Sequence, residues 1–156
     1  DGGPLFEKRF SIRNERTKHV YTSHERAGII NDLLAGIKPY IKEDDCLFAY
    51  GSIPAINYMT RTRPFIGCSW PELLSAPLLK QKLNNYKGPL PAILRQKFDS
   101  IGKEFGAPDE NYLIDCGVEA GTFKSNKKSQ VVNEFIEKNN YKIVFENQYF
   151  ILFLPQ

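Results

Sequence analysis

The chain has 156 residues, of which 42% are hydrophobic and 25% are charged, and its formal net charge is +3. This size and balance predict one globular domain with one core, and they exclude a chain that is disordered throughout. The small net charge and scattered basic residues exclude a typical nucleic-acid-binding protein, and no run of about 18 apolar residues predicts a membrane span.

The first expected helix covers residues 23–37. The residues TSHE at its beginning, 22–25, fit a capping box, in which the Thr22 hydroxyl accepts a hydrogen bond from the Glu25 N–H. Apolar residues then recur at helical spacing as far as Ile37. Pro39 ends the pattern, because the residue before a proline avoids the helical region.

The middle of the chain alternates short apolar runs with helical segments. CLFAY at residues 46–50 predicts a buried strand, a short helix is expected over residues 54–59, and residues 63–68 predict a second short strand or an extended loop. A further helix begins at Trp70, and Pro77 is expected to kink or split it. Its apolar side is expected to carry Leu73, Leu74, Leu78, Leu79 and Leu83.

The last third of the chain is predicted to contain one more central strand, a helix and a hairpin. Residues 92–98 fit a strand or a helix, and the prolines before them favour a strand. Residues 99–128 are rich in Gly, Lys and Asn and predict an insertion or a mobile loop. An amphipathic helix over residues 129–139 precedes two apolar runs, at residues 141–145 and 149–154, whose short connection predicts an antiparallel hairpin.

These elements predict an α/β fold in which helices flank a sheet in a two-layer or three-layer arrangement. Helical crossovers make the earlier strands parallel, and the C-terminal hairpin adds antiparallel strands at one side, so the sheet is expected to be mostly parallel. Residues 1–21 are interpreted as an extended N-terminal arm, and residues 22–156 as a single domain.

Two further features bear on the origin and chemistry of the chain. It begins at Asp1 without an initiator methionine or a signal segment, and we interpret it as part of a longer protein. The cysteines, Cys46, Cys68 and Cys116, include no CxxC pair, which excludes a zinc ribbon or a thioredoxin motif. Three buried thiols are favoured over one disulfide and a free thiol.

One candidate site lies where the CLFAY strand ends. Gly51, Ser52 and Ile53 follow that strand, and backbone N–H groups at such a corner can bind an anion. Arg61 and Arg63 can supply positive charge for the same ligand. The motif has a single glycine with a proline close behind it, so a structural turn with a capping serine is the competing interpretation.

Aromatic and basic residues give a second set of candidates. Trp70 can form an aromatic platform together with Tyr58 and Phe65, which would bind a sugar ring or a lipid headgroup. The alternative is that these rings pack in the core. Arg61 and Arg63 are expected near one end of the sheet, where they meet lipid phosphate or an anionic acceptor, or else pair with surface carboxylates. The spacing of histidines and carboxylates assembles no nucleophile, base and orienting group, so the sequence assigns no catalytic residue, metal site or cofactor.

The layout of the whole sequence resembles a known family. The runs that carry the resemblance are TSHERAGIINDLLAGIKPYI, DDCLFAYGSIPAINYMTRTRPF and VVNEFIEKNNYKIVFENQYFILFLP. They resemble the C-terminal soluble domain of bacterial polytopic membrane glycosyltransferases, a class that includes the dolichyl-phosphate-mannose mannosyltransferase-like proteins and the lipid-linked aminoarabinose transferase. The resemblance covers nearly the full chain, but residues 99–128 match no part of the pattern.

The resemblance implies a location on the extracytoplasmic, periplasmic face of a bacterial inner membrane. The implied partner is the transmembrane part of the same parent protein, together with a lipid-linked sugar or anionic lipid headgroups. The catalytic aspartate of that class has no counterpart in this chain, so the expected role is non-catalytic, assisting acceptor or lipid-linked donor binding. The alternative is a stand-alone small-anion-binding domain or enzyme that uses the corner at Gly51 and Ser52.

Overall fold

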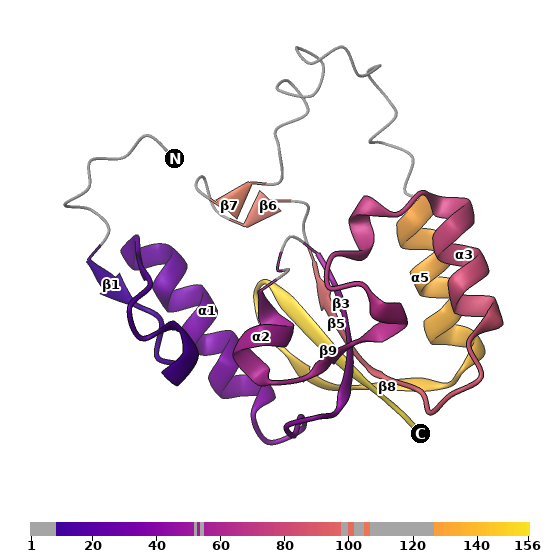
Figure 1. Cartoon of the computed structure of the whole chain (residues 1–156), viewed down its shortest axis with the longest axis horizontal. Helices are drawn as coiled ribbons and strands as arrows, with labels where there is room; N and C mark the ends of the chain where they lie inside the picture. The colour runs from indigo at the N-terminus through magenta and orange to yellow at the C-terminus, as the bar shows by residue number, and fades with distance from the viewer. Residues whose placement is uncertain (1–8, 52, 54, 98–99, 102–104, 107–126) are drawn as a thin grey trace, which may run out of the picture.

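The computed structural model describes residues 9–51, 53, 55–97, 100–101, 105–106 and 127–156. Its centre is a five-stranded sheet with the strand order β4-β3-β5-β9-β8, and helices lie on either side of it (Figure 1). In that order the strands are Arg63–Pro64, Cys46–Tyr50, Ala92–Gln96, Phe150–Pro155 and Tyr141–Glu146. The α-helices in the described residues are α1 His24–Ile37, α2 Ile56–Thr60, α3 Ala76–Asn85 and α5 Lys127–Lys138.

The helices and the central sheet together confirm the α/β class. The sheet is mixed, which corrects the expected strand pairing. Strand β3 runs parallel to both β4 and β5, as predicted for strands joined by helical crossovers. Strands β8 and β9 form the predicted antiparallel hairpin. Strand β9 also pairs antiparallel with β5, so the central sheet has as many antiparallel as parallel pairings and is not mostly parallel.

Strand β3 is the interior strand that the CLFAY pattern predicts, and it is buried on both faces. Leu47 and Ala49 belong to one apolar cluster, which includes residues of α1 and α2. Phe48 and Tyr50 belong to a second cluster, which includes residues of α3 and α5. Because successive side chains of a strand point to opposite faces, the two clusters lie on opposite sides of the sheet. This double burial explains the uninterrupted apolar run.

Two local predictions concern where helices begin. Helix α1 covers the expected range, but its N-cap is Ser23, whose hydroxyl accepts a hydrogen bond from the Arg26 N–H. Thr22 lies in the short strand β2, Tyr21–Thr22, so the predicted cap is one residue too early. The helix expected from Trp70 is split as predicted, into the 3-10 turn η4, Pro71–Leu73, and helix α3. Proline is tolerated in the first turn of α3 because the N–H it lacks has no partner there.

The part of the expected N-terminal arm that the structure describes is folded. Strand β1, Phe10–Ser11, pairs antiparallel with β2, and the 3-10 turn η2, Glu15–Thr17, lies between them. The Asn31 amide of α1 holds the residues at and just after β1, because its oxygen accepts from the Arg13 N–H and its nitrogen donates to the Ser11 carbonyl. The Asn14 side chain donates to the Met59 carbonyl. These contacts fix the segment against α1 and α2.

Most of the predicted insertion lies outside the described residues. Within it, the structure describes two short antiparallel strands, β6 Ser100–Ile101 and β7 Phe105–Gly106, and the beginning of α5. Cys46 and Cys68 are free, partly buried thiols, and Cys116 lies outside the described residues. In the described part of the chain, no helix is long and apolar enough to cross a bilayer.

Candidate functional site

The candidate residues lie at opposite ends of strand β3. Arg63 pairs with Cys46, the first residue of β3, whereas Gly51 follows Tyr50, the last. At the usual rise per residue, five residues of strand separate these ends by roughly 16 Å. Gly51 and the two arginines therefore cannot hold one small anion together. Ser52 lies outside the described residues.

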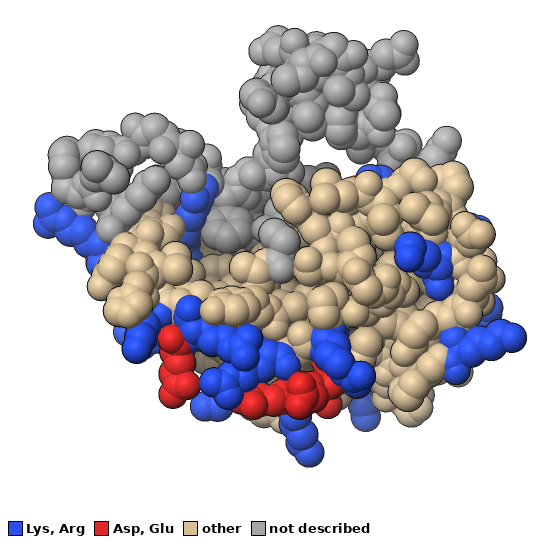
Figure 2. Space-filling model, in the orientation of Figure 1, with Lys and Arg blue, Asp and Glu red and all other residues tan. Residues whose placement is uncertain are grey.

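The amino end of β3 borders an open cleft of about 540 Å³, which we call the arginine cleft. Its lining is Arg16, Glu43, Asp44, Asn57, Tyr58, Arg61, Thr62, Arg63, Pro64 and Ser69. Basic and acidic side chains lie side by side along this lower edge of the molecule (Figure 2). Because the two signs are mixed, the cleft has little net charge to attract an anion.

Internal contacts already engage the arginines of the cleft. The Arg61 guanidinium lies 2.7 Å from a Glu43 carboxylate oxygen and 3.5 Å from one of Glu15. The Arg63 Nε donates to the Asp44 carbonyl at 2.9 Å. Arg16 stacks over the Tyr58 ring, 4.9 Å from its centroid. For Arg61, the structure shows the pairing with surface carboxylates that was the competing interpretation.

At the carboxyl end of β3, the structure supports the turn interpretation of the corner. The Ile53 N–H donates to the Gly51 carbonyl at 2.8 Å, so it is engaged within the turn and is not directed at a ligand. The Ile53 side chain is buried in the core. Gly51 has a backbone φ of +142°, and a Cβ placed there would lie 2.5 Å from the Gln96 Cβ. Backbone conformation and close packing both require glycine at this position.

Replacing Gly51 with alanine is expected to destabilise the domain by roughly 2 kcal/mol, because strained backbone and steric overlap act together. The matched control is Gly28→Ala in α1, where a Cβ meets nothing within 4 Å. Alanine in a helix is better than glycine by about 0.5–1 kcal/mol, so this control is expected to gain stability. Urea unfolding measures both changes. If Gly51→Ala unfolded at the same urea concentration as the wild type, the turn would not require glycine.

Glu72 faces this corner, and no sequence pattern singled it out. Both of its carboxyl oxygens are buried, and neither has a hydrogen-bond partner among the residues that the structure describes. Burial raises the pKa of the Glu72 carboxyl to about 7. The nearby backbone N–H groups of Glu72 and Gly51, although they make no well-formed hydrogen bond to it, and the charge of Lys128 lower this pKa only in part. The Lys128 ammonium itself donates to the Glu72 backbone carbonyl at 2.5 Å.

The position of Glu72 limits what the corner can bind. When its carboxyl is ionised, its negative charge repels a phosphate or another small anion from the Gly51 N–H. When it is protonated, it can donate a hydrogen bond to an uncharged oxygen. The corner is therefore better suited to a neutral polar group than to an anion.

The three aromatic residues proposed as a platform lie in different environments. Phe65 is fully buried and packs against Phe48 and Tyr86. Tyr58 is exposed and lies in the arginine cleft. Trp70 has 36% of its surface exposed, next to η4. A shared platform of these three rings is therefore not present.

Exposed leucines are a second feature that the sequence pattern did not predict. The helix expected from Trp70 placed five leucines on one apolar side, but only Leu79 and Leu83 of that set are in the buried core. Leu73 is 71% exposed and Leu78 is 40% exposed. The break before α3 explains the exposure of Leu73, because residues of a separate turn do not continue the helical stripe, whereas Leu78 lies within α3. The prolines at 71 and 77 are the sequence signal for that break.

Comparisons with known proteins identify no relative of this chain. No family model, no curated protein and no solved structure matches it. Among the described residues, no cluster of three His, Cys, Asp or Glu side chains could hold a metal ion.

Proposed function

We propose that this chain is a non-catalytic, extracytoplasmic domain of a membrane-embedded glycosyltransferase-like protein. Its role is to assist binding of the acceptor or of the lipid-linked sugar donor. Its partner is the transmembrane part of the same parent protein. The substrate chemistry in this proposal comes from the resemblance to C-terminal domains of that transferase class.

The observation that carries the proposal is the way the resembling runs are used in the fold. The run at residues 44–65 supplies strand β3, the corner at Gly51, helix α2 and strand β4. The run at residues 131–155 supplies most of α5 and the hairpin of β8 and β9. These runs build four of the five strands of the central sheet. The resemblance therefore lies in the framework of one folded unit, which supports reading the chain as a domain of that kind.

The alternative is a stand-alone domain or enzyme that uses the corner at Gly51 and Ser52. The observation in its favour is the buried Glu72 carboxyl, because groups with strongly shifted pKa values are concentrated at functional sites. The same carboxyl disfavours a small anion as the ligand, so this alternative applies to a neutral polar ligand.

The complete open reading frame that encodes this chain tests the proposed function. The proposal expects several apolar segments of about 20 residues in the same frame, since each such segment can span a bilayer as a helix. A frame that encodes this chain with no such segment would overturn the assignment to a membrane-embedded parent.

A second test separates the two candidate functions. The purified chain is expected to show no transfer or hydrolysis of sugar donors. Turnover that disappears in the Glu72→Gln variant, while its unfolding midpoint is retained, would establish the corner as an active site. Such a result would replace the accessory role with the alternative.

A further inference from the structure

We propose that the surface formed by Trp70, Leu73 and Leu78, with the lysines of α3 beside it, docks on an anionic lipid bilayer. We call it the tryptophan–leucine surface. The inference deepens the proposed function and rests on it, because it specifies which side of the domain faces the membrane.

Large apolar side chains are exposed in two consecutive turns, η4 and the first turn of α3. Leu73, Leu78 and Trp70 are 71%, 40% and 36% exposed. The backbone that presents them is fixed, because the Leu73 N–H donates to the Trp70 carbonyl and the Ser75 hydroxyl accepts from the Leu78 N–H. Large apolar side chains exposed in neighbouring turns are candidates for an interaction surface.

The chain around these apolar residues carries mainly positive charge. Residues 66–90 contain three lysines and one acidic residue, Glu72, whose carboxyl oxygens are buried. Lys80 pairs with Glu134, but Lys82 has no partner among the described residues. Lys82 lines a shallow groove together with Leu78. An apolar surface with an unpaired lysine beside it complements a bilayer with anionic headgroups.

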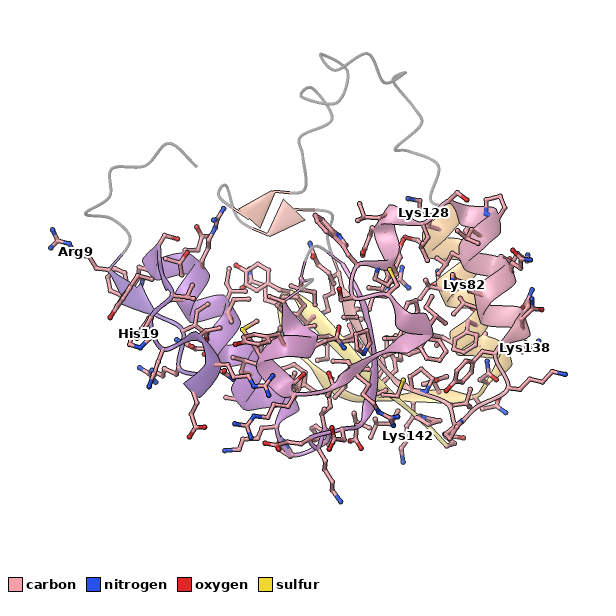
Figure 3. The ribbon with its side chains drawn as sticks, in the orientation of Figure 1. Arg9, His19, Lys82, Lys128, Lys138 and Lys142 are labelled. Carbon is pink, nitrogen blue, oxygen red and sulfur yellow. The ribbon has the colours of Figure 1, made fainter. Side chains whose placement is uncertain are left out.

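The figures show where two of the lysines and the charged side chains lie. Lys82 on α3 and Lys128 at the start of α5 lie on the same side of the molecule (Figure 3). Near the upper end of α3, the surface is largely uncharged, with basic side chains at its margin (Figure 2). Tryptophan suits this position, because its amphipathic ring favours the boundary between headgroups and acyl chains.

The arginine cleft is a weaker candidate for the same role. Its arginines contact Glu43, Glu15 and the Asp44 carbonyl, and it lies at the amino end of β3. Glu72 lies against Gly51, at the carboxyl end of β3. Because Glu72 is next to Leu73 in the chain, the tryptophan–leucine surface lies at this end, opposite the arginine cleft. A bilayer that meets one surface therefore leaves the other in solvent. Association with a second copy is disfavoured, because it would bring like-charged lysines together.

The experiment is co-sedimentation of the 156-residue chain with phosphatidylcholine vesicles, with and without phosphatidylglycerol, at low and high salt. The wild type is expected to bind the anionic vesicles, more strongly at low salt. Trp70→Ala/Leu73→Ala/Leu78→Ala is expected to bind at least about tenfold more weakly, because apolar insertion is lost. Arg61→Ala/Arg63→Ala is the control at the other end of the sheet and is expected to bind like the wild type. Circular dichroism checks that each variant is folded.

Three results of the vesicle experiment would overturn the proposal. They are the absence of wild-type binding to anionic vesicles, equal binding by the triple variant, and loss of binding in the arginine variant alone. A wild type that is dimeric in solution, and a triple variant that is monomeric, would also overturn it in favour of a second copy as the occupant. If vesicle binding fails but the open reading frame encodes membrane spans, the proposed function stands and only this surface is excluded.

Discussion

Replacing Phe65 with alanine is expected to destabilise the domain by roughly 3–5 kcal/mol, the range for removing a large aromatic side chain from a packed core. Phe65 is fully buried. Its ring centroid lies 4.4 Å from that of Tyr86 and 5.5 Å from that of Phe48, with both pairs edge-on. The ring also lies 6.0 Å from that of Phe135, so the substitution removes three aromatic contacts and leaves a cavity in the core.

Chemical denaturation with guanidinium chloride measures this effect. The control is Leu73→Ala, which removes a similar apolar side chain from a position that is 71% exposed. A surface change of this kind is expected to alter the free energy of unfolding by less than about 0.5 kcal/mol. If Phe65→Ala and Leu73→Ala gave equal losses, the packing of the second core cluster described above would be wrong.

Replacing Glu72 with glutamine is expected to remove a pH dependence of stability between about pH 4.5 and pH 7. Burial raises the pKa of this carboxyl from its ordinary value of 4.5 to about 7 in the folded protein. Between these values the unfolded chain is ionised at Glu72 and the folded chain is protonated, so folding takes up a proton. The contribution of Glu72 to the free energy of unfolding is therefore complete below pH 4.5, and it is lost as the pH rises through 7.

The size of this loss follows from the separation of the two pKa values. It amounts to up to roughly 3 kcal/mol in the free energy of unfolding, since one pKa unit corresponds to about 1.4 kcal/mol. Glutamine carries no charge at any pH, so Glu72→Gln is expected to be more stable than the wild type at pH 8 and to converge with it near pH 4.5. Urea unfolding at a series of pH values measures the difference between the two proteins. A constant difference across the series would show that Glu72 is not held in its neutral form.

The elements with the strongest periodicity were predictable from the sequence. Helix α1 and the strands β3, β8 and β9 lie where their patterns placed them. The order of the strands in the sheet was harder to predict. The hydrophobic pattern specifies which residues are buried, but it does not specify which strands pair with each other. Strand β9 pairs with β5 as well as β8, and this one pairing makes the sheet mixed.

The site was harder to predict than the fold. Arg61 and Gly51 are close in sequence, but strand β3 separates the ends at which they lie. The burial of Glu72 depends on packing between η4, the corner after β3 and the start of α5, which are distant in the chain. Local sequence around Trp70 gives no sign of this packing. It does contain the prolines that split the helix and leave Leu73 exposed.

The most direct measurement of the accessory role is sugar transfer by the parent protein in its membrane, compared with the same protein lacking residues 1–156. Initial rates at varied donor and acceptor concentrations separate KM from kcat. An accessory binding domain predicts that KM for the donor or the acceptor rises by about tenfold or more, while kcat is largely retained, because only ground-state binding is lost. Unchanged kinetic constants after removal of the domain, or loss of kcat with KM unaltered, would contradict the proposed role.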